Sequence, residues 1–271
     1  MVALTQVVDA GDGARAVEYE VADGVATITI NRPERRNALS VAAAERLRRL
    51  WDEVDGDHAV RVVILTSADC GTFCAGMDLK EASDVRRERG CDILEILSDP
   101  FYERMRSVAK PIVAAMTGHF AAGGMVLALN SDLRVGLAGT RGGITEAKVG
   151  RGSPWAVPLL WMLPQPVLME LTLTGELMPV ERLHALGFVN YVEPTPAAVR
   201  ARAAALAASV RDNAPLTILA GKASLNAAMS LGCQAGLAHA KEIYRPVYAS
   251  EDAKEGPLAF AEKRAPRWQG R

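Results

Sequence analysis

Apolar and polar residues alternate in two short stretches within residues 17–30. Alternation with a period of two is typical of strands that bury one face. Asp23 and Gly24 lie between the two stretches, and this dipeptide favours the tight turn of a hairpin. The pattern therefore predicts a β-hairpin. Residues 1–15 show no periodicity, so we expect them to form a loose chain end.

A helical period follows the hairpin. Ser40 is a good N-cap and Gly56 a good terminator, which predicts a helix between them. Four large apolar residues fall on one face of this helix: Leu47, Leu50, Trp51 and Val54. Residues 79–109 are polar with a helical pattern that is interrupted near Pro100.

Nearly continuous apolar runs at residues 60–66, 112–117 and 133–138 predict strands that are covered on both faces. Residues 124–130 predict a short buried helix. The repeated order of strand, loop and helix indicates an α/β fold with right-handed crossovers. From Leu159 onward the pattern is mostly helical.

A soft domain boundary is expected at Thr195, which lies between two prolines. An α/β core is predicted over residues 1–195, and a helical part over residues 196–271.

Two glycine-containing loops, at residues 73–80 and 118–124, each follow an apolar run and lead into a helical stretch. Backbone N–H groups at such a turn lack an intrahelical partner, which makes Met77 and Gly123 natural donors. Two N–H groups aimed at one oxygen form an oxyanion hole. The first hypothesis is therefore that the chain stabilises an oxyanion on a carbonyl-type substrate. The alternative is that both loops are tight turns without a ligand.

A single acidic residue, Glu146, lies in the apolar and glycine-rich stretch 142–150. Desolvation there would raise its pKa and suit it to general acid–base chemistry. The alternative is a solvated residue at a helix start, where the helix dipole favours a carboxylate. Trp155 and Trp161 are interpreted as core residues rather than as a substrate platform.

The amino-acid composition and net charge exclude several classes of function. The chain has 271 residues and a formal net charge of −1, with no basic stripe, so nucleic acid is not an expected partner. No run of 18 apolar residues and no leader pattern occurs, so neither a membrane span nor a signal peptide is predicted. The four cysteines lack metal-site spacing, which favours free thiols, a cytoplasmic location and no metal.

Several segments taken together resemble the crotonase, or enoyl-CoA hydratase/isomerase, superfamily. Each match is weak alone, but their number and order make the resemblance specific. In chain order they are residues 28–33 (ITINRP), 36–40 (RNALS), 73–80 (FCAGMDLK), 110–115 (KPIVAA), 118 with 122–124 (AGG), 173–176 (LTGE), 185–190 (ALGFVN) and 255–264 (EGPLAFAEKR).

The resemblance implies a spiral of ββα units with a helical C-terminal trimerisation region. It also implies an acyl-CoA substrate and a thioester enolate held by the N–H groups of Met77 and Gly123. Coenzyme A is part of the substrate, and no other cofactor is implied. The expected assembly is a homotrimer or a dimer of trimers. Residues implied to contact the substrate are Ala38, Ala75, Asp78, Leu79, Lys80, Gly124 and Val126, with Phe260 and Lys263 at the nucleotide end, from this subunit or a neighbouring one.

One departure from the family pattern bears on the reaction. Hydratases of this family carry two glutamates, and the position of the first, three residues after Gly123, is here Val126. The second is present as Glu146. One carboxylate suffices for a 1,3-proton shift, so the pattern favours a Δ3,Δ2-enoyl-CoA isomerase. A dienoyl isomerase is disfavoured, because its extra acid would fall near Pro154.

Two alternatives stay open. One is a hydratase or dehydratase with a replacement second acid, and the other is a catalytically silent CoA-binding protein. The polar segment holds five candidates for another acid or base: Glu81, Asp84, Glu88, Asp92 and Glu95.

Overall fold

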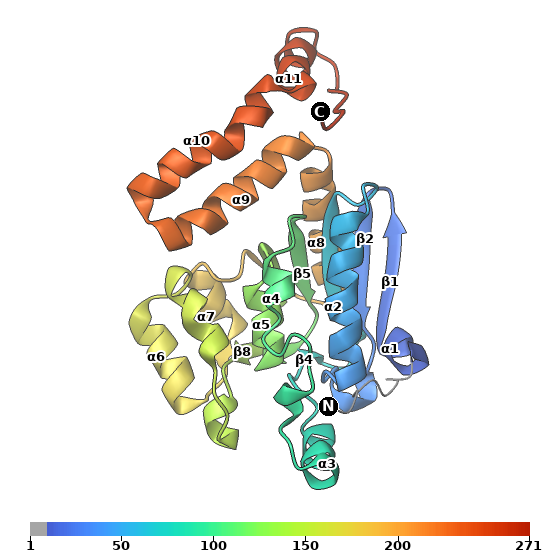
Figure 1. The fold of residues 1–271 in the computed structure, drawn as a ribbon, viewed down its shortest axis with the longest axis vertical. Helices are drawn as coiled ribbons and strands as arrows, with labels where there is room; N and C mark the ends of the chain where they lie inside the picture. The colour runs from blue at the N-terminus through green and yellow to red at the C-terminus, as the bar shows by residue number, and fades with distance from the viewer. Residues whose placement is uncertain (1–9) are drawn as a thin grey trace, which may run out of the picture.

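The larger of two β-sheets organises the structure, a computed structural model that describes residues 10–271 (Figure 1). Within this range its strand order is β1-β2-β3-β5-β7-β10. Only the first pair is antiparallel, and the remaining pairs are parallel. The strands are β1 (Val17–Ala22), β2 (Val25–Ile30), β3 (Val62–Ser67), β5 (Ile112–Met116), β7 (Leu133–Leu137) and β10 (Tyr191–Glu193).

The predicted hairpin is confirmed. Val17 pairs with Ile30 and Ala22 with Val25 in a regular antiparallel register. Asp23 has φ 49° and Gly24 has φ 77°, so both turn residues occupy the left-handed region that a tight primed turn requires.

A second, smaller sheet takes its strands β4 and β6 partly from the two glycine loops. The sequence patterns did not predict this sheet. Its order is β4-β6-β8-β9, with β4 (Thr72–Cys74), β6 (His119–Ala121), β8 (Arg141–Gly143) and β9 (Met178–Pro179). No strand in it exceeds three residues, which is too short for a periodicity signal. Close packing holds it together, because a Cβ on Gly142 would lie 2.0 Å from the Phe120 ring.

The two sheets combine into the expected spiral. In each repeating unit, a strand of the larger sheet is followed by a short strand of the smaller sheet and then by a helix. The units are β3-β4-α3 and β5-β6-α5. The helices are α3 (Leu79–Arg89) and α5 (Gly123–Leu129), the latter close to the predicted buried helix. An α/β fold built from ββα units is therefore confirmed.

Helices cover both faces of the larger sheet. Helix α2 (Val41–Gly56) begins at the predicted cap, because the Ser40 side chain accepts a hydrogen bond from Ala43 N. Its apolar face packs on one side of the sheet. Helix α8 (Pro196–Arg211) packs on the other side through Val199, Ala203 and Ala207.

The predicted loose end is wrong for residues 10–15, which belong to helix α1 (Ala10–Ala16). This helix contacts α2 closely, since a Cβ on Gly13 would lie 3.1 Å from the carbonyl oxygen of Ala42. That tertiary contact leaves no trace in local periodicity. Residues 1–9 lie outside the described residues.

The last helices extend away from the sheets (Figure 1). Helix α9 (Pro215–Leu231) lies beside α10 (Cys233–Ala249), and α11 (Glu251–Ala261) follows. The boundary near residue 195 stays a prediction, although α8 packs on the sheet. In the described part of the chain, no helix is long and apolar enough to cross a membrane. The shorter helices are α4 (Glu103–Arg106), α6 (Gln165–Thr174) and α7 (Val180–Ala185).

Candidate active site

The two glycine loops meet side by side. A Cβ on Gly76 would lie 2.8 Å from the Ala122 side chain and 3.1 Å from Gly123 N. A Cβ on Gly123 would lie 3.2 Å from the Cα of Gly76. Only glycines allow this approach, and Gly76 also has φ 94°, which disfavours other residues. The contact brings the backbone at Met77 next to that at Gly123.

The N–H group of Met77 is directed by its neighbours. Leu39 N donates to Gly76 O at 2.7 Å, and Asp78 N donates to Leu39 O at 3.0 Å. Because successive residues of an extended chain bond to opposite sides, the Met77 N–H points away from Leu39. It has no backbone partner within the described residues. Its freedom therefore comes from this bridge and not, as expected, from the start of a helix, since α3 begins at Leu79.

Gly123 matches the expected arrangement, because it is the first residue of α5 and its N–H has no intrahelical partner. The preceding Ala122 has φ 50° and ψ −117°, a conformation that an L-residue rarely adopts. A hydrogen bond from Ala122 N to Gly143 O, 3.1 Å long, holds this turn. Such strain is concentrated at functional sites.

A cavity of about 300 Å³ is lined by both Met77 and Gly123. Of the residues that line it in the described chain, Glu146 is the only acidic one, and most of the others are apolar. The predicted site residues among them are Ala75, Met77, Leu79, Gly123, Val126 and Glu146. The other lining residues include Leu94, Phe101, Tyr102 and Trp155.

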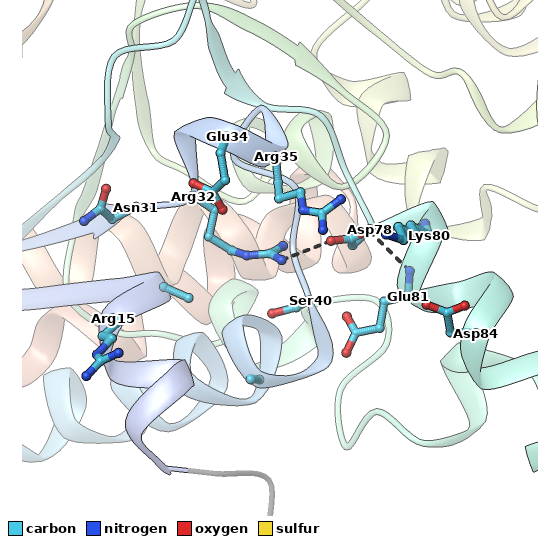
Figure 2. Close-up of a pocket in the computed structure, with 12 residues that line it drawn as sticks. Arg15, Asn31, Arg32, Glu34, Arg35, Ser40, Asp78, Lys80, Glu81 and Asp84 are labelled. Atoms are coloured by element: carbon cyan, nitrogen blue, oxygen red, sulfur yellow. Dashed lines mark hydrogen bonds and ion pairs between the residues drawn. The ribbon is translucent and has the colours of Figure 1, made fainter. Parts of the chain in front are cut away.

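A second, polar cavity of about 570 Å³ lies on the other side of the first loop (Figure 2). Successive residues of the loop alternate between the two cavities, with Met77 and Leu79 facing the apolar one and Asp78 and Lys80 the polar one. Four cationic and four acidic side chains line the polar cavity, so its formal charges cancel: Arg15, Arg32, Arg35 and Lys80 against Glu34, Asp78, Glu81 and Asp84.

Three of the predicted substrate contacts have clear structural roles. The Asp78 side chain caps α3 and forms a 3.0 Å ion pair with Arg32, which together with the cap holds its pKa below the usual range despite burial. The carbonyl oxygen of Ala38 accepts a hydrogen bond from the same arginine. A Cβ on Gly124 would lie 2.2 Å from Cys74 O, so this glycine lets α5 pack on β4.

Glu146 begins a short 3₁₀ turn, Glu146–Val149, and is buried. Its Oε1 accepts a hydrogen bond of 3.1 Å from Nε1 of Trp155, while Oε2 is buried and has no partner in the described structure. Burial raises the pKa of Glu146 above its ordinary value of 4.5. The backbone N–H of Glu146, the Trp155 hydrogen bond, the backbone N–H of Thr145 and the charge of Arg151 oppose this rise. The arrangement suits a general base.

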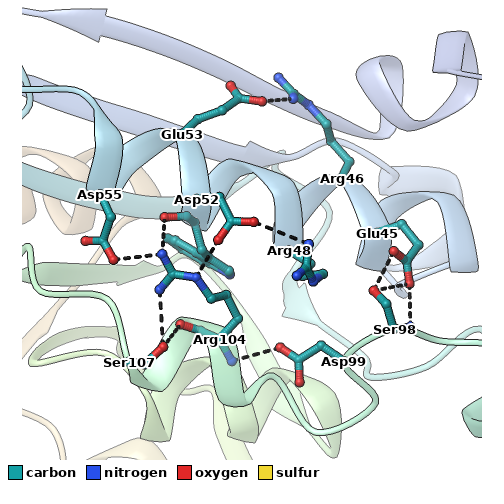
Figure 3. A network of polar contacts seen from close by, with 11 residues as sticks. Glu45, Arg46, Arg48, Asp52, Glu53, Asp55, Ser98, Asp99, Arg104 and Ser107 are labelled. Atoms are coloured by element: carbon teal, nitrogen blue, oxygen red, sulfur yellow. Dashed lines mark hydrogen bonds and ion pairs between the residues drawn. The ribbon is translucent and has the colours of Figure 1, made fainter.

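The lining of the apolar cavity also includes Phe101 and Tyr102, from the segment before α4. A polar network fastens this segment and α4 to α2 (Figure 3), and it includes hydrogen bonds from Ser98 Oγ to the Glu45 carboxylate. Arg104 donates to Asp52 at 2.6 Å and to Asp55 at 2.8 Å. Polar contacts on the outside of this segment therefore hold its apolar side chains, Phe101 and Tyr102, in place along the cavity.

A second ion pair joins the Glu146 turn to the polar segment. Arg151 donates to both carboxylate oxygens of Asp92, at 2.6 and 3.0 Å, and its backbone N donates to Glu146 O. This pairing holds the pKa of Asp92 below its usual range. None of the five acids considered as a replacement for Glu146 lines the apolar cavity in the described structure.

Phe260 and Lys263 lie far from the loops in this chain. Phe260 belongs to α11 and is 88% exposed, and α11 and α3 are at opposite ends of the molecule (Figure 1). The structure thus does not bring these two residues together with the cavity of their own subunit. Trp155 packs against the main hydrophobic core, as interpreted, but it also hydrogen-bonds Glu146. The core interpretation is wrong for Trp161, which is 58% exposed. A tryptophan nine residues from the candidate base was the only available signal.

In the described chain, no cluster of three or more His, Cys, Asp or Glu side chains is arranged to hold a metal. The buried Cys74 belongs to the first loop and accepts a hydrogen bond from Gly76 N at 3.4 Å. Burial raises its pKa to about 12, so this thiol stays protonated.

Comparisons with known proteins agree with this geometry. The family model described as enoyl-CoA hydratase/isomerase matches residues 20–271. The chain is 34% identical to (E)-benzylidenesuccinyl-CoA hydratase of Thauera aromatica, over 94% of this chain and 99% of that protein. It is 36% identical to a putative enoyl-CoA hydratase of Thermus thermophilus, over 90% of this chain and 97% of the relative.

Solved structures extend the similarity to the fold. The crystal structure of an enoyl-CoA hydratase from Mycobacterium tuberculosis H37Rv aligns with a TM-score of 0.86 and 37% identity, covering 95% of this chain and all of that one. The Bacillus anthracis enoyl-CoA hydratase aligns with a TM-score of 0.87 and 27% identity, over 94% of this chain and all of that one. The chain therefore belongs to the enoyl-CoA hydratase/isomerase family, and it is an enzyme of the acyl-CoA thioester type.

Proposed function

We propose that the protein moves a double bond in an enoyl-CoA, as a Δ3,Δ2-enoyl-CoA isomerase does. The observation that carries this proposal is the composition of the apolar cavity. Glu146 is the only carboxylate among its described lining residues, and Val126, where hydratases of the family carry an acid, lines the same cavity. Addition of water needs help from a second polar group, whereas a proton shift does not.

The proposed reaction uses the loops and Glu146 in turn. The thioester carbonyl oxygen accepts hydrogen bonds from the N–H groups of Met77 and Gly123. Glu146 takes a proton from C2 of a 3-enoyl thioester, and the electron pair of that C–H bond delocalises onto the carbonyl oxygen as a dienolate. The protonated Glu146 then returns the proton to C4, which gives the 2-enoyl thioester. Each N–H donor in such a site typically contributes about 3 kcal/mol to transition-state stabilisation.

A paired assay tests the choice between isomerisation and hydration. The enzyme is given a short 3-enoyl-CoA in one reaction and the matching trans-2-enoyl-CoA in another. We expect conversion of the first to exceed hydration of the second by roughly 10²-fold, the size of effect expected for one acid–base group. Hydration as fast as that of a two-glutamate relative measured alongside would overturn the isomerase assignment.

The relatives favour a second candidate. The proteins at 34% and 35% identity are named (E)-benzylidenesuccinyl-CoA hydratase and enoyl-CoA hydratase EchA19. A hydratase built on the present cavity would need a water held by groups other than a second carboxylate. The same assay separates the two candidates, and binding of both thioesters without any turnover would instead favour a silent CoA-binding protein.

We further propose that coenzyme A enters past Ala38, Leu79 and Lys80. Leu79 is 55% exposed at the edge of the apolar cavity, and Lys80 is exposed beside it. Lys80 has no ion pair within the described residues, so its ammonium group is available to a phosphate.

The Lys80→Ala variant is expected to raise KM for an acyl-CoA roughly two- to fivefold with kcat unchanged, as for one exposed ion pair. Steady-state kinetics at low and high salt measure this, and the difference should shrink at high salt because exposed charges are screened. Lys80→Arg keeps the charge and is the matched control. Equal KM values for the wild type and Lys80→Ala at low salt would contradict this role.

Assembly is also a proposal. Leu225 on α9 and Leu237 on α10 are 74% and 60% exposed, which supports a further subunit packing against these helices. A homotrimer or a dimer of trimers would allow Phe260 and Lys263 to reach a neighbouring subunit's site. Sedimentation analysis tests the assembly, and a cytoplasmic location stays a prediction.

A further inference from the structure

The two carboxylate oxygens of Glu146 have different surroundings. Oε1 accepts the hydrogen bond from Trp155 Nε1 at 3.1 Å. Oε2 is buried and has no hydrogen-bond partner within residues 10–271. A buried carboxylate oxygen without a partner is costly unless a ligand meets it, so we expect the substrate to meet Oε2.

The Trp155 ring has little freedom to move away. It lies near the start of a 3₁₀ helix, Pro154–Trp161, and packs against the main hydrophobic core. It lines the 300 Å³ cavity and also a neighbouring cavity of about 410 Å³. Phe101 and Val126 border both cavities as well, so the three side chains form a partition between them. The indole N–H therefore reaches Glu146 from a fixed wall.

We propose that Trp155 is a positioning residue, whose indole N–H holds Oε1 of Glu146 so that Oε2 carries the proton between C2 and C4 of the substrate. This inference rests on the proposed function, in which Glu146 is the base. Its physical advantage is orientation: a carboxylate that rotates freely presents either oxygen, whereas a fixed one presents a single oxygen at one angle.

The other charged groups near Glu146 do not hydrogen-bond its carboxylate in the described structure. Arg151 lowers the pKa, but its guanidinium group is paired with Asp92. Lys148 lines the cavity and pairs with Glu176 at 2.6 Å. On the adjacent helix α6, Glu170 is exposed and pairs with Arg182.

The remaining neighbours are the backbone and Tyr102. The N–H groups of Thr145 and Glu146 also lower the pKa of Glu146. Burial raises the pKa of Tyr102 well above its usual range, so it stays neutral. Within the described structure, Trp155 is thus the side chain that hydrogen-bonds the Glu146 carboxylate.

An NMR titration of the wild-type protein tests the contact without any substrate. The chain has four tryptophans, so ¹⁵N labelling gives a small set of indole N–H signals, and Trp155→Phe identifies the relevant one by its loss. We expect the Trp155 signal to move with pH around a midpoint above 4.5, the ordinary Glu value, and to stay constant in Glu146→Gln. A Trp155 signal that does not titrate, or that titrates equally in Glu146→Gln, would overturn the proposal.

Kinetics of Trp155→Phe test the consequence. Phenylalanine keeps an aromatic partition but removes the N–H donor, so the pKa that governs the acid limb of kcat should rise by about one pH unit. We also expect kcat on the plateau to fall roughly tenfold, with KM nearly constant. Trp161→Phe is the matched control on the same 3₁₀ helix, because Trp161 is 58% exposed and does not line this cavity.

The outcomes separate the two proposals. An acid limb at the same pH in Trp155→Phe and the wild type would overturn the positioning role. A titrating indole signal in a protein that turns over neither enoyl-CoA would overturn the proposed function while leaving the contact established. If the protein isomerises the 3-enoyl-CoA but its indole signal does not depend on Glu146, the proposed function stands and the positioning role of Trp155 is overturned.

Discussion

Replacing Glu146 by Gln is expected to lower isomerisation by roughly 10²- to 10⁴-fold, the usual contribution of a general base. The amide has nearly the same shape, but it cannot take a proton from C2. Solvent deuterium exchange at C2 of a bound acyl-CoA provides a second readout, because it reports proton removal even when no product forms. Exchange should disappear in the variant.

The pH profile of the wild type gives an independent check. Burial raises the pKa of Glu146 above 4.5, and the active form is the carboxylate. Activity is therefore present above the raised pKa and is lost as the pH falls through it, at a higher pH than for a solvated glutamate. Glu146→Gln should lack this acid limb.

A matched control for this experiment is Glu81→Gln. Glu81 is also partly buried with a pKa raised chiefly by burial, but its carboxylate accepts a hydrogen bond from Val41 N and does not line the apolar cavity. We expect exchange to persist in this variant. Exchange that survives in Glu146→Gln and disappears in Glu81→Gln would assign the base to the polar segment instead.

The second large effect is expected at the junction of the two loops. In Gly123→Val, the new side chain would meet Gly76 Cα, since even its Cβ would lie only 3.2 Å away. The same Cβ would lie 3.7 Å from Met77 N, which is one of the two proposed donors. The loops must separate, so the two N–H groups no longer converge. Loss of one donor alone costs about 10²- to 10³-fold in kcat, and we expect turnover to be abolished.

The protein should nevertheless stay folded, because Gly123 is at the edge of a cavity and its φ is not in the left-handed region. Circular dichroism and thermal melting measure this. Gly56→Val is the control, since nothing lies within 4 Å of a Cβ there. Full turnover by a folded Gly123→Val protein would refute the oxyanion hole.

Much of the fold was predictable from local patterns. The hairpin, α2 and the three long buried strands follow from periodicity and from caps such as Ser40, because each depends on neighbouring residues. The spiral arrangement was predictable only through the ordered family motifs. The short strands β4, β6, β8 and β9 were not, since a two- or three-residue strand is stabilised by its partner rather than by its own sequence.

The candidate site shows the same division. Residue types at Gly76, Gly123 and Glu146 marked the proposed chemistry in the sequence, because that chemistry needs a missing side chain or a carboxylate at those points. The reason why Met77 has a free N–H was not predictable. It depends on the bridge to Leu39, which is distant in the chain.

The sequence by itself thus indicated the family, and it predicted the two loops as hydrogen-bond donors, Glu146 as a single acid and Val126 in place of a second one. Only the tertiary structure decided how they are arranged: which of these residues line the cavity, that the polar segment places none of its acids there, and that Trp155 hydrogen-bonds Glu146. The physical reason is that residue type is local, whereas burial, the direction of a hydrogen bond and the pKa of a carboxyl group depend on what the rest of the chain brings alongside it.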